Sequence, residues 1–353
     1  MRKIQDYILK DNKIYVGLED SKRTWKLCIR SDGMIVHETS MPADYDNLKR
    51  YLGGCYPGCR IQVIYEAGFS GFWLHDLLMR DEIDCVVTPA NRVTVAKVNK
   101  IKTDKRDARR LAKNLENGDY VRCHVPDAER REDRQLSRTL EQIQRDIIRA
   151  KNRIRRFLDF HGLNGDMKHG NWYSSDYRKL RELPLQGSLK VCLDSYLHIL
   201  DELEETKAAF QKELSLLCKK ERYAQSVNAK KSIPGIGLLT AIRLTLEWGE
   251  MSRFPSGKHI ASFTGLTSRE YSTGDSIRRG RITGHGSESV RSWLIQSSWR
   301  ALRLDPALLE KFQKVWKNSG SKKKAIVAIA RKMAVRMRAI ELSQYHYCTS
   351  VVE

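Results

Sequence analysis

The sequence lacks any apolar run approaching the roughly 20 residues that a helix needs to cross a bilayer. Its first residues, Met-Arg-Lys-Ile-Gln-Asp, contain no apolar core of the kind that a secretory signal peptide requires. The eight cysteines are scattered, and the close pair Cys55 and Cys59 has no second pair or histidine partner to complete a zinc set. We therefore expect a cytoplasmic protein with reduced thiols and without a membrane segment or a structural zinc.

Acidic residues are few relative to basic ones. The 353 residues include 64 lysines and arginines against 43 acids, which gives a formal charge of +21. Such an excess indicates a polyanionic partner, either nucleic acid or a membrane surface, and nucleic acid is the simpler expectation without a membrane segment. The length suffices for two or three domains with sizeable cores.

The N-terminal third has the pattern of three antiparallel strands followed by alternating helices and strands. The expected strands are 13–19, 24–30, 33–38, 60–66 and 84–88, and the expected helices are 43–52, 72–79 and 107–116. This order predicts a mixed α/β sheet with helices on both faces, as in a ribonuclease H-like domain.

Acidic residues stand at the ends of these predicted elements. Glu19 ends the first strand with Asp20 beside it, Glu66 ends the fourth, and Asp104 and Asp107 open the helix after the fifth. Open α/β sheets place their sites at such positions. Four carboxylates gathered there could bind two Mg²⁺ ions across a phosphate, one activating the attacking oxygen and one stabilising the leaving oxygen. The alternative is unrelated surface acids, two of which suit the first turn of a capped helix.

The middle of the chain contains two heptad seams, in residues 136–157 and 189–217, which predict long helices with coiled-coil packing. The helices either fold back on each other or pair with a second chain. The first helix is rich in arginine, whose guanidinium group can donate two hydrogen bonds to phosphate oxygens. We therefore expect this helix to face nucleic acid. Its basic residues are Arg130, Arg131, Arg134, Arg138, Arg145, Arg149, Lys151, Arg153, Arg155 and Arg156.

The run Ser-Ile-Pro-Gly-Ile-Gly at 232–237 is similar to the hairpin of a helix-hairpin-helix module. Gly235 and Gly237 would let backbone N–H groups approach a phosphate closely; the alternative is a plain glycine turn between two helices. Further along, Arg278, Arg279 and Arg281 alternate with glycine in a segment that also suits phosphate contact.

Together these motifs resemble the DEDD transposases of the insertion-sequence one-ten family, particularly its eleven-eleven group, and the related Piv-type DNA invertases. The matching segments are VGLEDSK at 16–22, YEAG at 65–68, VVTP at 86–89, KTDKRDARRLA at 102–112, and the later order Pro-Gly-Ile-Gly, Phe, Gly-Leu, Ser/Thr-Gly and Gly-Arg-Ile-Thr. The resemblance implies a RuvC-like first domain whose metal tetrad falls on Glu19, Glu66, Asp104 and Asp107. The family's first Asp is Glu19 here, so Asp20 remains a second candidate ligand.

The resemblance also implies a serine nucleophile in the second transposase domain, just before a glycine. Aligned strictly on Gly274, that column holds Thr273, and Ser272 lies one residue earlier. We favour Ser272 because a primary hydroxyl is less hindered, with Thr273 as the alternative. The implied domains are a catalytic domain at 1–122, a helical coiled-coil region at 123–228, and a transposase domain at 229–353 with the serine and a basic C-terminal helix.

The implied activity is RNA-guided DNA recombination: Mg²⁺-dependent excision and insertion of an insertion sequence through a transient phosphoserine link. The implied partners are donor and target DNA, a guide RNA, and further copies of the chain in a dimer or tetramer. Lys102, Lys105 and Arg106 beside the tetrad, and Arg145, Arg149, Arg153 and Arg156 in the middle, are the expected nucleic-acid contacts.

Two other functions fit parts of the pattern. A metal-dependent nuclease or Holliday-junction resolvase would use the acids alone, with water as the nucleophile. A non-catalytic nucleic-acid-binding protein would explain the charge and the glutamate at the first tetrad position, but it leaves the acids at the strand ends unexplained.

Overall fold

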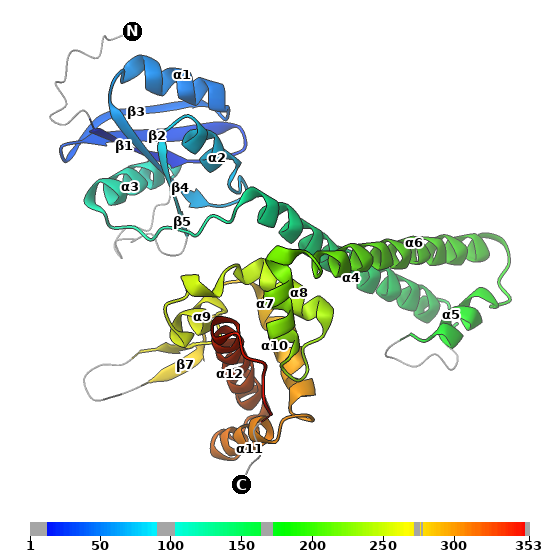
Figure 1. Cartoon of the computed structure of the whole chain (residues 1–353). Helices are drawn as coiled ribbons and strands as arrows, with labels where there is room; N and C mark the ends of the chain where they lie inside the picture. The colour runs from blue at the N-terminus through cyan, green and yellow to red at the C-terminus, as the bar shows by residue number, and fades with distance from the viewer. Residues whose placement is uncertain (1–12, 90–102, 164–171, 272–275, 277, 350–353) are drawn as a thin grey trace. The chain divides into compact units, whose positions relative to one another are not determined.

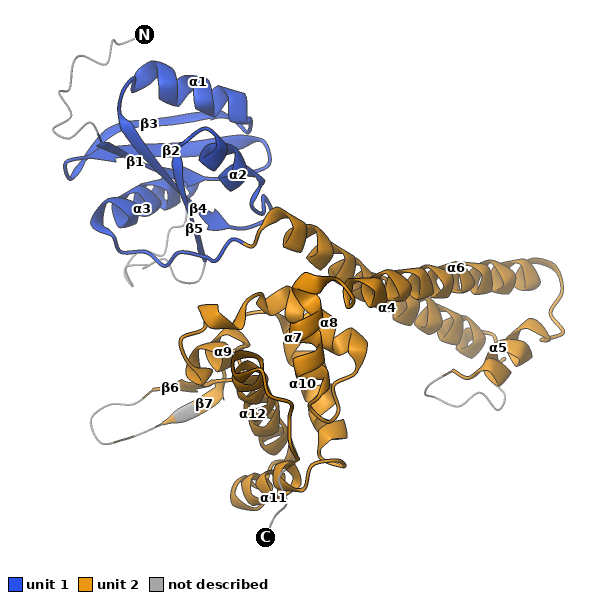
Figure 2. Cartoon of the chain, in the orientation of Figure 1, with its two compact units in different colours: residues 1–125 blue, residues 126–353 orange. Residues whose placement is uncertain are grey.

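The computed structural model describes residues 13–89, 103–163, 172–271, 276 and 278–349. The chain divides into two compact units, residues 1–125 and 126–353 (Figure 2). The second unit contains both the predicted helical region and the predicted transposase domain, and their separation at residue 228 stays a prediction. In the described part of the chain, no helix combines the length and apolarity needed to cross a membrane.

Unit 1 is built on a five-stranded sheet in the order β3-β2-β1-β4-β5 (Figure 1). Strands β1 to β3 are antiparallel neighbours, whereas β4 runs parallel to β1 and β5 runs parallel to β4. This arrangement confirms the predicted mixed α/β sheet and is consistent with a ribonuclease H-like domain. The strands are β1 (Lys13–Glu19), β2 (Thr24–Ser31), β3 (Met34–Pro42), β4 (Arg60–Ala67) and β5 (Asp84–Pro89).

Helices cover both faces of this sheet, as predicted (Figure 1). Helices α1 (Tyr45–Cys55) and α2 (Trp73–Arg80) pack against one face through Leu48, Leu74 and their neighbours. Helix α3 (Asp104–Asn117) packs against the other. It begins at Asp104, one of the two acids expected to open it, because Thr103 caps it, accepting a hydrogen bond from the backbone N–H of Arg106 at 3.4 Å.

Gly17, in the middle of β1, allows α3 to lie directly on the sheet. A Cβ atom at this position would stand 2.2 Å from the carbonyl oxygen of Ala108 and 2.3 Å from the amide nitrogen of Ala112. Both alanines are buried, so the backbones of strand and helix meet without intervening side chains. This contact fixes the first turn of α3 relative to the end of β1.

Unit 2 is mainly helical. Its long helices α4 and α6 pack on each other through Ile147, Ile154, Leu193, Leu200 and neighbours, so both heptad seams are at least partly buried within one chain. The elements are α4 (Ala128–Phe160), α5 (Ser174–Arg181), α6 (Gly187–Leu217), α7 (Glu221–Lys231), α8 (Leu238–Trp248), a 3₁₀ turn η1 (Met251–Arg253), α9 (Gly257–Phe263), β6 (Ser268–Glu270), β7 (Arg279–Ile282), α10 (Glu288–Ala301), α11 (Pro306–Ser319) and α12 (Lys322–Ser343).

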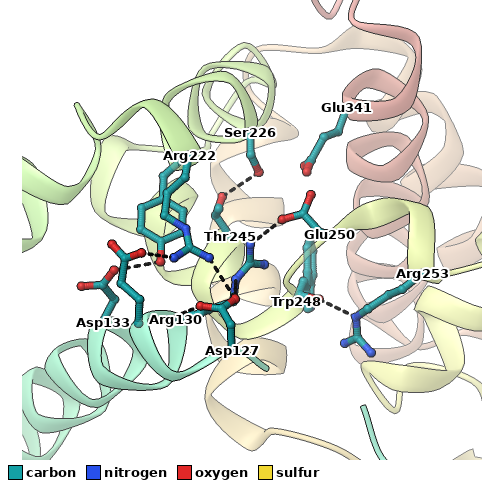
Figure 3. A network of polar contacts seen from close by, with 12 residues as sticks. Asp127, Arg130, Asp133, Arg222, Ser226, Thr245, Trp248, Glu250, Arg253 and Glu341 are labelled. Atoms are coloured by element: carbon teal, nitrogen blue, oxygen red, sulfur yellow. Dashed lines mark hydrogen bonds and ion pairs between the residues drawn. The ribbon is translucent and has the colours of Figure 1, made fainter. Parts of the chain in front are cut away.

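A polar network fastens the start of α4 to the rest of unit 2 (Figure 3). The buried guanidinium of Arg130 donates a hydrogen bond to Glu250, and Arg222 of α7 pairs with Asp127 at 2.9 Å. Nearby, the fully buried ammonium of Lys230 pairs with Glu341 of α12. Burying a charge is costly unless the charge is paired in this way. These contacts therefore stabilise the packing of the start of α4 against the rest of unit 2.

The same region corrects the expectation that the whole basic face of α4 meets nucleic acid. Arg134 donates to Glu247 of α8 at 2.8 Å, and Arg138 donates to the same carboxylate at 2.8 Å. The carboxylate of Glu247 is 7% exposed. The physical reason is that the buried negative charge of Glu247 would be costly if these two guanidinium groups did not pair with it. The largely buried Arg130 and Arg134 therefore serve the fold of unit 2, whereas Arg138 pairs with Glu247 and stays 52% exposed.

Candidate active site

Two of the predicted metal ligands lie on the sheet face that α3 covers. Successive strand residues alternate between faces, and Leu18 enters the core on the face of α1 and α2. Gly17 faces α3, so Glu19, two residues later, also points to that side. In β4, Ile64 packs with residues of α3, which places Glu66 on the same side.

Helix α3 brings the two aspartates to this face. The guanidinium of Arg110 donates to Glu66 Oε1 at 3.1 Å and pairs with Asp107 Oδ1 at 2.9 Å. Glu66 and Asp107 therefore contact the same guanidinium group, although they are 41 positions apart in the sequence. Asp104 lies one turn earlier on α3 and is exposed.

The acids share one electrostatic environment. The pKa of Glu19 is raised to about 7, first by burial and then by the negative charges of Glu66, Asp107, Asp20 and Asp104. Side-chain contacts link Glu66 to Asp107 through Arg110, and the negative charges of the other predicted ligands all raise the pKa of Glu19. That all four act as one tetrad stays a prediction.

Asp20 lies next to Glu19, but the alternation of the strand turns it the other way. Its carboxylate accepts a hydrogen bond from the Ser70 hydroxyl, in the loop after β4. Burial raises its pKa, opposed by a backbone hydrogen bond, and Glu66 adds to the rise. Glu19 is the better-placed first ligand in this geometry, and the choice between the two stays a prediction.

The oxygen chemistry of these residues suits a hard divalent cation, although their arrangement in the described ranges does not hold one. The side chain of Asp107 is 5% exposed, and its Oδ2 atom has no hydrogen-bond partner among the described residues. The hydroxyl of Thr88, paired in register with Glu66, is buried and also lacks a partner there. As they stand, no three acid, histidine or cysteine side chains in the described ranges are arranged to hold a metal, and Arg110 supplies the positive charge between the acids.

Thr88 is absent from the predicted site. Strand alternation places it on the α3 face, since Val86 packs against that helix, and the parallel pairing sets it beside Glu66. The signal in the sequence is its position at the end of the fifth strand, where the acids of the neighbouring strands also stand.

The basic residues predicted beside the tetrad have different surroundings. Lys105 and Arg109 both pair with Glu38 of β3, Lys105 at 3.2 Å. Arg106 is exposed, and Lys102 lies outside the described residues. These ion pairs link α3 to the edge strand β3 of the sheet. The side chain of Lys105 is nevertheless 61% exposed.

The predicted nucleophiles belong to the connection between β6 and β7, which pair as an antiparallel hairpin. Ser272 and Thr273 lie outside the described residues. The base of the hairpin is tightly built: a Cβ on Gly265 would meet the carbonyl oxygen of His285 at 2.0 Å, and one on Gly286 would meet that of Phe263 at 2.2 Å. These two glycines therefore serve close backbone packing at the base of the loop.

Comparison with known proteins places both units in one family. Residues 228–313 match the family described as "Transposase IS116/IS110/IS902 family", and residues 16–162 match the IS110-type DEDD domain described as "Transposase". The chain belongs to this transposase family. The range that matches the DEDD domain contains the four predicted ligands Glu19, Glu66, Asp104 and Asp107, and their role as metal ligands stays a prediction.

Three relatives illustrate the likeness. A Sinorhizobium fredii protein named as a transposase, y4qE, is 30% identical over 67% of this chain and 57% of its own length. The transposase for insertion sequence element IS1533 of Leptospira borgpetersenii is 24% identical over 71% of this chain and 74% of its own. The pilin gene-inverting protein of Moraxella bovis is 36% identical over 29% of this chain and 32% of its own. A DEDD transposase is an enzyme of DNA cleavage and strand transfer.

The transposase exposes part of the basic surface predicted for nucleic acid. Arg145 is 61% exposed beside Glu141, and Arg149 is 71% exposed beside Asp146. Arg153 lies over the ring of Tyr196, and Arg156 is exposed. In the hairpin, Arg278 and Arg281 are exposed, while Arg279 begins β7 and its side chain lies outside the described part of the chain.

The two glycines of the Pro-Gly-Ile-Gly run differ. A Cβ on Gly235 would stand 2.5 Å from the carbonyl oxygen of Ser297 and 2.8 Å from the amide nitrogen of Ala301, so close packing against α10 explains this glycine. Gly237 has open space around it and precedes α8 without a side-chain cap. Contact of this segment with phosphate stays a prediction.

Proposed function

We propose that this transposase is an RNA-guided DNA recombinase that excises an insertion sequence and inserts it at a specific site. The observation that carries the proposal is the gathering of Glu19, Glu66, Asp104 and Asp107 at one end of a ribonuclease H-like sheet, in a chain of a DEDD transposase family. The sheet order supports a RuvC-like domain. A polypeptide that only binds DNA has no evident use for acids whose negative charges raise the pKa of Glu19.

The four acids would hold Mg²⁺, because carboxylate oxygens are the hard ligands this ion prefers. When bound, one or two such ions activate the attacking oxygen and stabilise the leaving oxygen of a phosphodiester. The chain's own contribution is to hold the carboxylates on one rigid face and to offer Arg110 as their counter-ion until the cation binds. The unpartnered oxygens of Asp107 and Thr88 support this assignment.

Ser272 would attack the scissile phosphorus, with Thr273 as the alternative. A serine–phosphorus ester forms, the bond from phosphorus to one sugar oxygen breaks, and that oxygen takes the hydroxyl proton. Attack by a sugar hydroxyl of another strand then restores a phosphodiester and returns the proton to serine. The close backbone packing of Gly265 and Gly286 at the base of the hairpin supports this role.

The remaining proposals concern partners. The charge of +21 and the exposed arginines of α4 support binding of donor DNA, target DNA and a guide RNA. The coiled-coil pair of α4 and α6 and a helix-hairpin-helix-like segment around Gly237 would position these nucleic acids. The acids and the serine belong to different units, so a dimer or tetramer could complete each site with residues from two copies.

The test is trapping of a covalent adduct. Purified transposase is incubated with Mg²⁺, co-purified RNA and a labelled DNA carrying the element's ends, then denatured and examined for DNA bound to protein. We expect an adduct that Ser272→Ala abolishes and that Ser276→Ala, an exposed serine of the same hairpin, retains. Loss with Thr273→Ala instead identifies threonine. Cleavage without any adduct in the wild type contradicts the proposal and favours a nuclease that uses water.

A further inference from the structure

Unit 2 contains a cavity of about 530 Å³ beside the segment around Gly237, lined also by residues that the proposed function does not use. Three helices form its walls: α4, the beginning of α8 and α10. The residues lining it that matter here are Arg145, Gly237, Arg243, Trp293 and Arg300.

Arg243 is a buried cation that forms no ion pair with an acid in the described residues. The residue is 7% exposed, and its Nε atom has no hydrogen-bond partner in the part of the chain that the structure describes. Its Nη2 atom is 3.5 Å from the side-chain oxygen of Gln144, at the limit of a hydrogen bond, and its guanidinium lies 5.2 Å from the ring centre of Trp293. Burial lowers the pKa of Arg243, although the group stays charged.

The acid that lines the cavity is already engaged. Glu141 pairs with Arg145 at 2.7 Å and accepts a hydrogen bond from the Ser289 hydroxyl. The negative charge of Glu141 raises the pKa of Arg243, but the two described side chains form no ion pair. Arg300 is exposed at the cavity and forms no ion pair with any residue in the described ranges. Three arginines thus face one carboxylate, and the cavity carries excess positive charge.

Backbone groups add to this charge. Helix α8 begins after Gly237, and no side chain caps its first N–H groups. Those groups carry the positive end of the helix dipole at the cavity, where Gly237 leaves open space. A buried guanidinium with an unused N–H, beside an uncapped helix start, is a combination suited to an anion.

We propose that this cavity binds one phosphate of a nucleic-acid backbone, with Arg243 as its buried anchor and Arg300 at its rim. The inference rests on the proposed function, because it is the nucleic-acid substrate or guide that supplies the phosphate. The Arg243 guanidinium lies over the ring of Trp293, 5.2 Å from its centre, and both residues line the cavity. An uncompensated buried charge costs stability, and a phosphate oxygen removes that cost on binding.

The experiment measures affinity for a labelled DNA duplex and a labelled RNA hairpin as a function of salt, with the full-length chain. We expect Arg243→Gln to weaken binding about tenfold and to reduce the slope of log affinity against log salt by about one. Arg300→Gln, an exposed change that leaves the core intact, should reduce the slope similarly. Arg181→Gln is the matched control, since Arg181 already pairs with Asp201 and is not part of the cavity.

The DNA and RNA measurements distinguish the possible sources of the phosphate. A reduced slope with DNA alone or with RNA alone identifies which backbone fills the cavity, and Arg243→Lys, which keeps the charge, should restore the slope. If the wild type binds and both Arg243→Gln and Arg300→Gln keep its affinity and slope, the cavity proposal is overturned and the recombinase proposal stands. If the wild type binds neither DNA nor RNA, both proposals fail.

Discussion

Replacing Asp104 by alanine should abolish DNA strand cleavage while leaving nucleic-acid binding intact. The change removes an exposed carboxylate from the first turn of α3 and therefore leaves the packing of the helix unchanged. If this oxygen holds the cation that stabilises the reacting phosphate, its loss should cost roughly 4 kcal/mol of transition-state stabilisation, or about a thousandfold in cleavage rate. The measurement is single-turnover cleavage of a labelled substrate, with binding followed separately by fluorescence anisotropy.

Asp46→Ala is the matched control for this variant. Asp46 is also an exposed acid in the first turn of a helix of unit 1, but α1 packs on the opposite face of the sheet. We expect wild-type cleavage from it. Cleavage that persists in Asp104→Ala at the wild-type rate would remove this residue from the catalytic site.

Replacing Gly17 by alanine should have the largest effect on stability of any single methyl group added to unit 1. The new Cβ would meet backbone atoms of α3 at 2.2 and 2.3 Å, and backbone cannot rotate out of the way as a side chain can. We expect unit 1 to lose at least about 3 kcal/mol of unfolding free energy, at the upper end of the range for overpacked sites. Because α3 carries Asp104 and Asp107, cleavage should be lost as well. Hydrogen exchange of peptides from β1 and α3 measures the loss directly.

Gly53→Ala provides the comparison. Gly53 lies within α1, and a Cβ atom added there would meet nothing within 4 Å, so alanine should stabilise the helix by up to about 1 kcal/mol. If Gly17→Ala proved as stable and as active as Gly53→Ala, the close contact of β1 with α3 could not be what positions the acids.

The elements of unit 1 are predictable because their patterns are local. Turn residues separate the strands, and Thr103 marks the start of α3. Unit 2 is less predictable. Helices α7, α10 and α11 have no counterpart in the pattern-based prediction, because α10 buries serines such as Ser297 and Ser298 where an apolar stripe is expected. Asp305 followed by proline does signal the start of α11, since its side chain accepts from the N–H of Leu308 at 3.1 Å.

The sequence named a set of candidate site residues, but it did not predict how they are arranged. Strand ends indicate that Glu19 and Glu66 belong together, yet no pattern indicates that Arg110 stands between Glu66 and Asp107. The roles of the glycines also cannot be predicted from the sequence alone. Gly235 resembles a phosphate-binding residue in sequence, but in the structure it packs closely against α10. Likewise, the arginines of α4 look alike in sequence, but in the structure Arg134 and Arg138 pair with the buried Glu247 and Arg145 and Arg149 pair with acids of α4 itself.

The central claim is that acids from three segments form one cation site, and the stability of unit 1 tests it. The raised pKa of Glu19 means that the folded chain keeps a proton that the unfolded chain has lost between its ordinary value of 4.5 and about 7. The folded state then binds more protons, so the unfolding free energy must fall as pH rises through that window.

The measurement is the urea midpoint of unit 1, followed by pulse proteolysis in chelator at pH 5 and pH 7.5, then with Mg²⁺ at pH 7.5. We predict that the midpoint falls with pH more steeply in the wild type than in Glu19→Gln. Mg²⁺ at ten to a hundred times its Kd should restore about 1–3 kcal/mol to the wild type and much less to Asp107→Asn. An Mg²⁺ effect that is absent from the wild type, or equal in both proteins, would contradict a shared cation site.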